Sequence, residues 1–156
     1  MAFNLSQKET MLLQDQQKHE ELCIQKYQNY ARQAQDPQLK QLFNSLEQHE
    51  QQHLNTVNQL LSGQVPNMQQ GQQNQSQFEQ AMQQNNNSGQ ANQNDIVMCN
   101  DMLATEKYIS GTYDTTIFEC TNANARQALN HIQKEEQQHG EAIYNYLNSH
   151  GAYNVQ

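Results

Sequence analysis

The stretch NSLEQHEQQHLNTV, residues 44–57, decides the fold of this chain, because it recurs as NHIQKEEQQHGEAI at residues 130–143. The first copy contains HEQQH, which has the letters of the HExxH motif, in which two histidines one helical turn apart hold zinc. The second copy reads EEQQH, so the first histidine of that motif does not recur, and no third zinc ligand is evident nearby. Both copies keep a Glu-x-x-His pair, which is Glu50 with His53 in the first copy and Glu136 with His139 in the second.

The repeat extends over both halves of the chain. A shift of 86 residues aligns them without a gap, placing Glu106 over Glu20 and Tyr113 over Tyr27. Repetition at a fixed offset indicates two copies of one structural unit. We therefore expect each half to contribute the same elements and the same polar positions to the fold.

Each half carries the start and stop signals of a helical hairpin. Ser6 and Glu9 form a capping box, and Asp36 before Pro37 is an N-cap followed by proline at the first helical position. The remaining signals are Asp95 as the start of the third helix, Asn122 at the turn that follows it, and Gly63 and Gly151 at the ends of the second and fourth helices. No strand-like alternation competes with this pattern, so we predict an all-α chain of four helices of about 25 residues.

The predicted organisation is a single domain over residues 1–156, a length that suits one domain with a real core. Its helical hairpins span 6–62 and 95–150. The connection between them, 63–94, is rich in Gln and Asn and cannot supply a packed core. Within it, Ser76 and Glu79 have the spacing of a capping box for a short local helix.

A core-facing row runs along each predicted helix in steps of three and four residues, and polar residues interrupt each row at mid-length. These polar residues are Glu20, Glu50, His53, Glu106, Glu136 and His139. The first three lie 16, 14 and 17 residues from Asp36, which is about 21–26 Å at 1.5 Å per residue, and the second half repeats this spacing. Antiparallel helices therefore bring all six to one level. His49 and Glu135 lie off the rows, and we predict that they face solvent.

Four carboxylates in one buried layer need cations, because isolated buried carboxylates are costly and repel one another. Two divalent cations would neutralise them, with the histidines as neutral ligands. Oxygen-rich ligation with imidazole and without thiolate suits two iron or manganese ions. The structural alternative is a polar layer that has lost its metals.

One Glu from each of two helices and Glu-x-x-His from each of the other two resembles the ferritin-like di-iron or di-manganese carboxylate superfamily. The resemblance implies an antiparallel four-helix bundle with a long crossover between helices two and three. It makes all six residues metal ligands, with Glu20 and Glu106 as the single-helix glutamates. It also implies that Tyr27 and Tyr113 hydrogen-bond to ligating carboxylates. No residue is assigned a catalytic role.

A narrower resemblance is to the spore coat F (CotF) family of endospore-forming bacteria, carried by residues 101–155, including their Glu-Cys-x-Asn turn and Tyr-Asn-Val ending. It implies a place in the spore coat, with other coat proteins or copies of the same chain as partners. Two functions remain open. One is a coat protein whose metals stabilise the bundle. The other is a di-metal oxidase, peroxidase or manganese-catalase-like enzyme, and iron storage is a third option.

Composition argues against several partners. The net charge is −8 with eight Lys plus Arg, which is unsuited to nucleic acid or an anionic membrane. The first residues have no charged and apolar regions of a signal peptide, and no stretch approaches a membrane span. The cysteines, Cys23, Cys99 and Cys120, suit a reducing compartment and packing as small hydrophobes.

Overall fold

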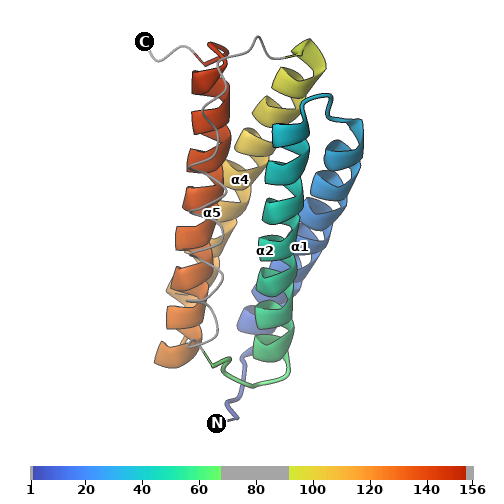
Figure 1. The fold of residues 1–156 in the computed structure, drawn as a ribbon. Coiled ribbons are helices and arrows are strands. Elements are labelled where there is room, and N and C mark those ends of the chain that lie inside the picture. Colours follow the sequence, from blue (N-terminus) through green and yellow to red (C-terminus); the bar gives the residue numbers. More distant parts are fainter. Residues whose placement is uncertain (1, 68–91, 154–156) are drawn as a thin grey trace.

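The computed structural model describes residues 2–67 and 92–153, which form four α-helices and no β-strand (Figure 1). The helices are α1 (Gln7–Gln33), α2 (Pro37–Leu61), α4 (Gln93–Glu119) and α5 (Ala123–Ser149). The prediction of an all-α four-helix bundle is confirmed. The predicted capping box at Ser76 and Glu79, and most of the predicted linker, lie outside the described residues. None of the four helices is long and apolar enough to cross a bilayer.

Most predicted helix ends are confirmed by their capping geometry. The Ser6 hydroxyl accepts from the Glu9 backbone N–H, and the Glu9 carboxylate accepts from the Ser6 N–H. The Asp36 carboxylate caps α2 by accepting from the N–H of Gln38, and Asn122 caps α5. Gly63 follows α2 with φ 77°, a left-handed conformation that glycine adopts without strain.

The predicted start of the third helix at Asp95 is wrong. Helix α4 begins at Gln93, and the Asn92 side chain caps it by accepting from the N–H of Asn94. Asn92 and Asp95 stand 86 residues after Ser6 and Glu9, so they repeat the positions of the first capping box. Asp95 lies inside the first turn of α4, and its carboxylate accepts hydrogen bonds from the backbone of Gln35 and Asp36 instead.

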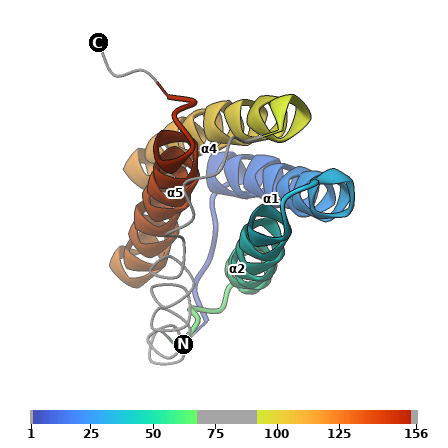
Figure 2. The same cartoon turned by 45° about the horizontal axis from the view of Figure 1, so that its top comes forward.

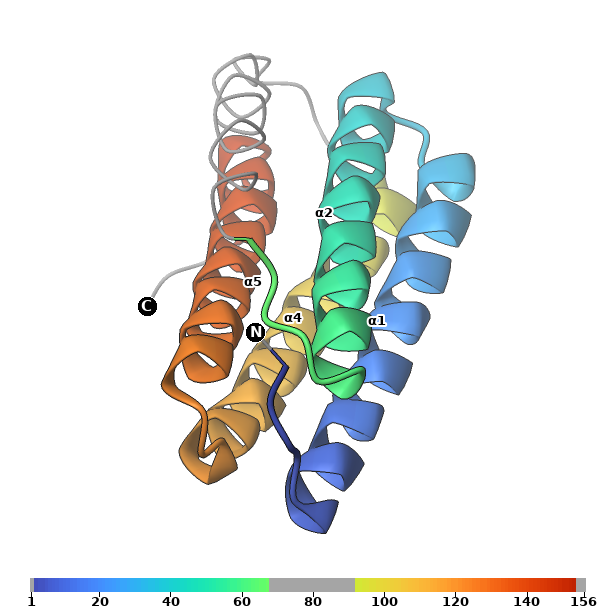
Figure 3. The ribbon, with the colours of Figure 1, turned by 90° about the horizontal axis from the view of Figure 1, so that it is seen from below.

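The four helices are arranged as two antiparallel hairpins that face each other. Short turns join α1 to α2 and α4 to α5, and α2 ends at the opposite end of the bundle from the start of α4 (Figure 1). Helix α1 packs against α4, whereas α2 lies across from α5 (Figure 2). Seen from below, the N-terminal segment runs beside the segment that follows α2 (Figure 3), where the Phe3 N–H donates to the Gly63 carbonyl at 2.8 Å.

The apolar core is divided into two clusters. One lies towards the α1–α2 turn and contains Tyr27, Phe43, Leu46, Met102 and Tyr146 among others. The second lies towards the α4–α5 turn and contains Leu13, Leu60, Ile109, Tyr113 and Leu129 among others. All three cysteines are buried and free. The middle of each helix is therefore held by apolar packing on both sides.

Two carboxylates near helix starts tie the hairpins together reciprocally. Glu9 of α1 accepts from the backbone N–H and the hydroxyl of Thr121, in the α4–α5 turn, at 2.7 and 2.9 Å. Asp95 of α4 accepts from the backbone N–H groups of Gln35 and Asp36, in the α1–α2 turn, both at 2.9 Å. Each hairpin thus holds the turn of the other, and the two contacts are related by the internal repeat.

Replacing Glu9 by Gln should destabilise the fold and change its response to acid. Burial alone would raise the pKa of Glu9, but hydrogen bonds from Thr121 and Ser6 outweigh it and lower the pKa to about 2. A lowered folded pKa gives stability that is present above the unfolded pKa and lost as pH falls through the folded value. Thermal unfolding at pH 7 should show a loss of about 1–3 kcal/mol for Glu9→Gln, and its stability should fall less between pH 5 and pH 2. Glu21→Gln, at an exposed position of α1, is the control, and equal curves for both variants would contradict the role of Glu9.

Candidate metal centre

The six polar residues predicted from the repeat converge in the middle of the bundle. Each has at most 2% of its surface exposed. Their donor atoms form two groups in which all atoms lie within 4.8 Å of one another. The first group is Glu20, Glu50, His53 and Glu136; the second is Glu50, Glu106, Glu136 and His139. The predicted convergence is therefore observed, whereas ligation of a metal remains a prediction.

Glu50 and Glu136 belong to both groups, so these two carboxylates lie between them. Each is the glutamate of a Glu-x-x-His pair, and the three-residue spacing puts the histidine on the same helix face. Each group takes three residues from one hairpin and one glutamate from the other. The arrangement suits two cations bridged by carboxylates that come from opposite hairpins.

Both histidines turn Nδ1 towards the carboxylates. Nδ1 of His53 lies 2.9 Å from Oε1 of Glu136 and 3.2 Å from Oε2 of Glu50. Nδ1 of His139 lies 2.9 Å from Oε1 of Glu50 and 3.4 Å from Oε1 of Glu106. Nδ1 is therefore the nitrogen of each ring that can join the carboxylates around a cation.

The two predicted tyrosines reach these carboxylates, and each reaches the opposite hairpin. The Tyr27 hydroxyl donates to Glu106, and the Tyr113 hydroxyl donates to Oε1 of Glu20 at 2.5 Å. Burial, reinforced by the neighbouring carboxylates, raises the pKa of both phenols, so they keep their protons and act as donors. Each tyrosine thereby orients the single-helix glutamate of the facing helix.

Three carboxylate oxygens of the cluster are buried without a hydrogen-bond partner among the described residues: Oε2 of Glu20, Glu106 and Glu136. Buried polar atoms in native proteins are nearly always satisfied, since leaving them unpaired costs about 1–3 kcal/mol or more when charged. Burial and the surrounding carboxylates raise the pKa of Glu20 and of Glu136. The donor set therefore fits divalent cations, which would satisfy these oxygens and offset the repulsion.

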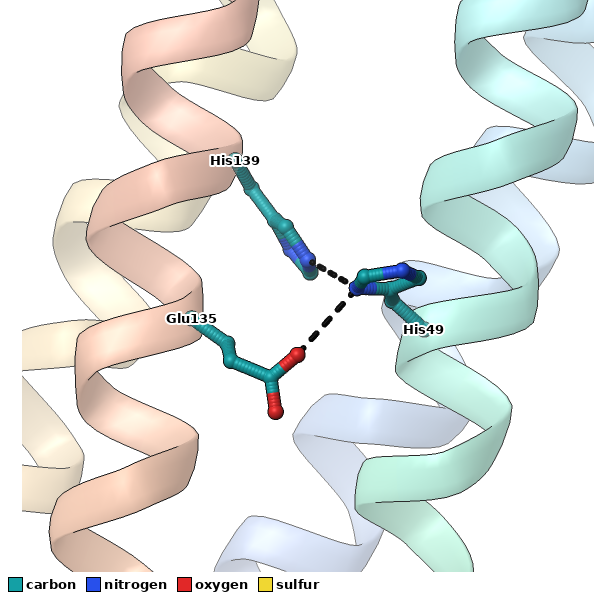
Figure 4. A group of neighbouring side chains, drawn as sticks. All are labelled: His49, Glu135 and His139. Carbon is teal, nitrogen blue, oxygen red and sulfur yellow. Dashed lines mark hydrogen bonds and ion pairs between the residues drawn. The ribbon is translucent and has the colours of Figure 1, made fainter. Parts of the chain in front are cut away.

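The prediction that His49 and Glu135 face solvent is wrong. They are 7% and 9% exposed, and they meet between α2 and α5, where Nδ1 of His49 lies 3.2 Å from Oε2 of Glu135 (Figure 4). A helix packed on two neighbours buries a stripe wider than a single row of three- and four-residue steps. The sequence spacing is consistent with a buried His49, because His49 lies three residues after Leu46 and four before His53, both of which belong to the core-facing row.

The histidines of the HExxH stretch do not converge on one point. His53 belongs to the inner group, whereas His49 groups with Glu135 and His139. No group of potential ligands found in the described residues contains both His49 and His53. The geometry agrees with the interpretation that HEQQH is not a zinc-protease motif here.

A surface pocket of about 500 Å³ between α4 and α5 reaches the layer of buried polar residues. Glu106 and Glu136 line it, together with Leu103, Gly140 and Tyr144 among others. The pocket was not predicted, because it depends on how far apart two helices lie, which helical periodicity does not specify. It offers a small molecule an approach to one side of the cluster.

Comparison with known proteins finds a similarity in the second half of the chain. Residues 94–156 match the Coat F domain, a stretch that starts in the first turn of α4 and contains Glu106, Glu136 and His139. No curated protein and no solved structure matches the chain. The part of the chain that supplies half of the polar cluster is thus similar to a Coat F domain.

Proposed function

We propose that this protein is a spore coat protein of the coat F type whose bundle core binds two divalent metal ions, iron or manganese. The observation that carries the metal proposal is the buried cluster with its three unpartnered carboxylate oxygens. The coat assignment rests on the Coat F match over residues 94–156. Other coat proteins, or further copies of this chain, are the partners that such a role implies.

The helix arrangement supports a ferritin-like bundle. Two hairpins stand face to face, and α2 ends at the opposite end of the bundle from the start of α4 (Figure 1). Helices α2 and α5 carry the Glu-x-x-His pairs and α1 and α4 carry one glutamate each, as in the di-iron and di-manganese carboxylate proteins.

The residues divide naturally between two ions. Glu20 and His53 would hold one ion, and Glu106 and His139 would hold the other. Glu50 and Glu136 belong to both groups and would bridge them. Iron or manganese bound here would supply redox chemistry with dioxygen or peroxide. Tyr27 and Tyr113 would keep one oxygen of Glu106 and of Glu20 in place, leaving the second oxygen of each for the ion.

The alternative function is a di-metal oxidase, peroxidase or manganese-catalase-like enzyme. The pocket lined by Glu106 and Glu136 favours it, because a small oxidant could approach the ions from that side. In a coat protein whose metals serve only stability, the same pocket has no chemical role. We favour the coat protein, since the Coat F match supports a place in the spore rather than a reaction.

Metal content tests the proposal directly. Metal-free protein dialysed against Mn²⁺ should hold two ions per chain. Glu20→Gln removes a charge from one group, so the content should fall to one ion or fewer, measured by elemental analysis after equilibrium dialysis. Glu21→Gln, at the next and exposed position of the same helix, should keep two. Equal metal content in both variants would contradict the ligand assignment.

Metal binding should release protons and remove a sensitivity to rising pH. In the metal-free protein Glu20 and Glu136 have raised pKa values. Burial lowers the pKa of the two imidazoles, but the surrounding carboxylates raise it overall, for His139 to about 9. Raised folded pKa values give stability that is present below the unfolded pKa and lost as pH rises through the folded value. Melting temperatures of the metal-free protein should therefore fall between pH 6.5 and pH 9.

The metal-loaded protein should be stabilised by about 2.7 kcal/mol for each bound ion at a hundredfold excess of free metal over Kd. Because the ions displace the protons of these four groups, calorimetric titration in buffers of different ionisation enthalpy should show proton release. Superimposable melting curves with and without chelator over this pH range would argue against the site.

Oxidant turnover separates the two functions. If the centre only stabilises the bundle, Tyr27→Phe with Tyr113→Phe should cost about 0.5–1.5 kcal/mol per hydrogen bond and leave metal content unchanged. If the centre is catalytic, the loaded wild type should consume peroxide or dioxygen faster than free metal, and the double variant should be about 10–100-fold slower at equal loading. Consumption no faster than free metal by iron- and manganese-loaded wild type supports the coat protein without turnover.

A further inference from the structure

A third group of potential ligands lies between α2 and α5 and shares only His139 with the six-residue cluster (Figure 4). It consists of Nδ1 of His49, the carboxylate of Glu135 and a ring nitrogen of His139. The three side chains point towards one another from the two facing helices (Figure 4). Nδ1 of His49 is 3.2 Å from Oε2 of Glu135 and 3.3 Å from Nε2 of His139. We call these three residues the outer group.

The separations within the outer group fit ligands around one small cation. Zinc–ligand distances are about 2.0–2.2 Å for imidazole nitrogen and carboxylate oxygen, which puts neighbouring ligands of a tetrahedral site about 3.3–3.6 Å apart. The observed distances from Nδ1 of His49, 3.2 Å to Glu135 and 3.3 Å to His139, agree with this ligand–ligand distance within a few tenths of an ångström. Both exceed the usual length of about 2.9–3.0 Å for a strong hydrogen bond from nitrogen.

Nδ1 of His49 cannot form hydrogen bonds to Glu135 and to His139 at the same time. An imidazole nitrogen carries either one proton or one lone pair. With a proton, Nδ1 of His49 can donate to Glu135 and then has no lone pair for His139; with a lone pair, it can accept from His139 and then faces the anionic Glu135. A cation in the centre of the group instead accepts a lone pair from each of the three residues.

We propose that His49, Glu135 and His139 form a separate binding site for one divalent transition-metal ion of the zinc, cobalt or ferrous type. Two imidazoles and one carboxylate make a nitrogen-rich donor set, which suits these ions better than manganese. The six-residue cluster, with four carboxylates, is richer in oxygen and suits manganese as well as iron. The set also equals the two-histidine, one-glutamate ligation of open zinc sites, in which solvent completes the coordination.

The surroundings of Glu135 support a ligand role. Nε2 of His131 lies 2.6 Å from Oε1 of Glu135, which orients the carboxylate and leaves Oε2 turned towards His49. The His131 side chain is 30% exposed, whereas those of Glu135 and His49 are 11% and 9% exposed. Potential ligands therefore run from the surface into the core, and an ion can enter the outer site from the α2–α5 side.

One ring serves both sites through opposite nitrogens. Nδ1 of His139 faces Glu50 and Glu106, whereas Nε2 faces His49. When both sites are filled, the neutral ring gives up its remaining N–H proton to solvent, and each nitrogen lone pair binds one ion. The outer site does not require the inner ions, since His49 and Glu135 belong to neither inner group.

Titration of the metal-free, full-length protein with Co²⁺ tests the outer site. Equilibrium dialysis counts the bound ions, and visible absorption distinguishes four-coordinate Co²⁺ by its stronger bands. Compared with wild type, His49→Gln and Glu135→Gln should each lose one ion per chain together with the strong bands. His19→Gln replaces a partly buried histidine of α1, outside the outer group, and should bind as wild type does. The double variant Glu20→Gln with Glu106→Gln should keep the outer ion and its spectrum.

The outcomes separate this inference from the dinuclear proposal. Unchanged stoichiometry and spectrum in both His49→Gln and Glu135→Gln, with circular dichroism showing intact helices, would overturn the outer site and leave the dinuclear centre standing. A wild type that binds one ion, lost in those two variants but kept in the Glu20 and Glu106 double variant, would support the outer site and overturn the dinuclear centre. No binding of Co²⁺ by wild type would overturn the outer site.

Discussion

The need to neutralise four carboxylates in the middle of an apolar bundle is the constraint on which the rest of this structure depends. Each of these carboxylates is at most 2% exposed: Glu20, Glu50, Glu106 and Glu136. Because like charges this close repel one another, the four carboxylates can all be ionised only if cations neutralise them; otherwise some of them must hold protons. The apolar clusters on either side of the layer hold the helices together. The two histidines and two tyrosines around the carboxylates supply the remaining partners.

Because of the internal repeat, each hairpin makes equivalent hydrogen bonds to the other. Glu9 holds the turn of the second hairpin and Asp95 the turn of the first, while Tyr27 and Tyr113 each donate to a glutamate of the opposite hairpin. Neither hairpin can satisfy its own turn or orient its own single-helix glutamate. Assembly of the two hairpins and formation of the polar layer are therefore coupled, which makes a half-assembled bundle costly. The two halves differ at a buried position beside the layer, where His49 in the first hairpin corresponds to Glu135 in the second.

Much of the fold and most of the inner cluster could be predicted from the sequence, because both depend on local rules. The capping box at Ser6 and the N-cap at Asp36 mark helix starts through contacts within a few residues. Glu50 and His53 share a face because three residues are nearly one helical turn. The start of α4 was misplaced, since Asp95 has the chemistry of an N-cap but its carboxylate binds the α1–α2 turn, 59 and 60 residues away in sequence.

By itself, the sequence determined four helices, their pairing into hairpins and the common height of six polar residues, since these follow from periodicity, capping and the 1.5 Å rise. Only the tertiary structure decided which carboxylate each tyrosine meets, that His49 and Glu135 are buried, and that a pocket reaches Glu106 and Glu136. These features depend on the distance and rotation between helices that are far apart in the chain. Side-chain packing across the whole bundle sets those quantities, and no local pattern of residues encodes them.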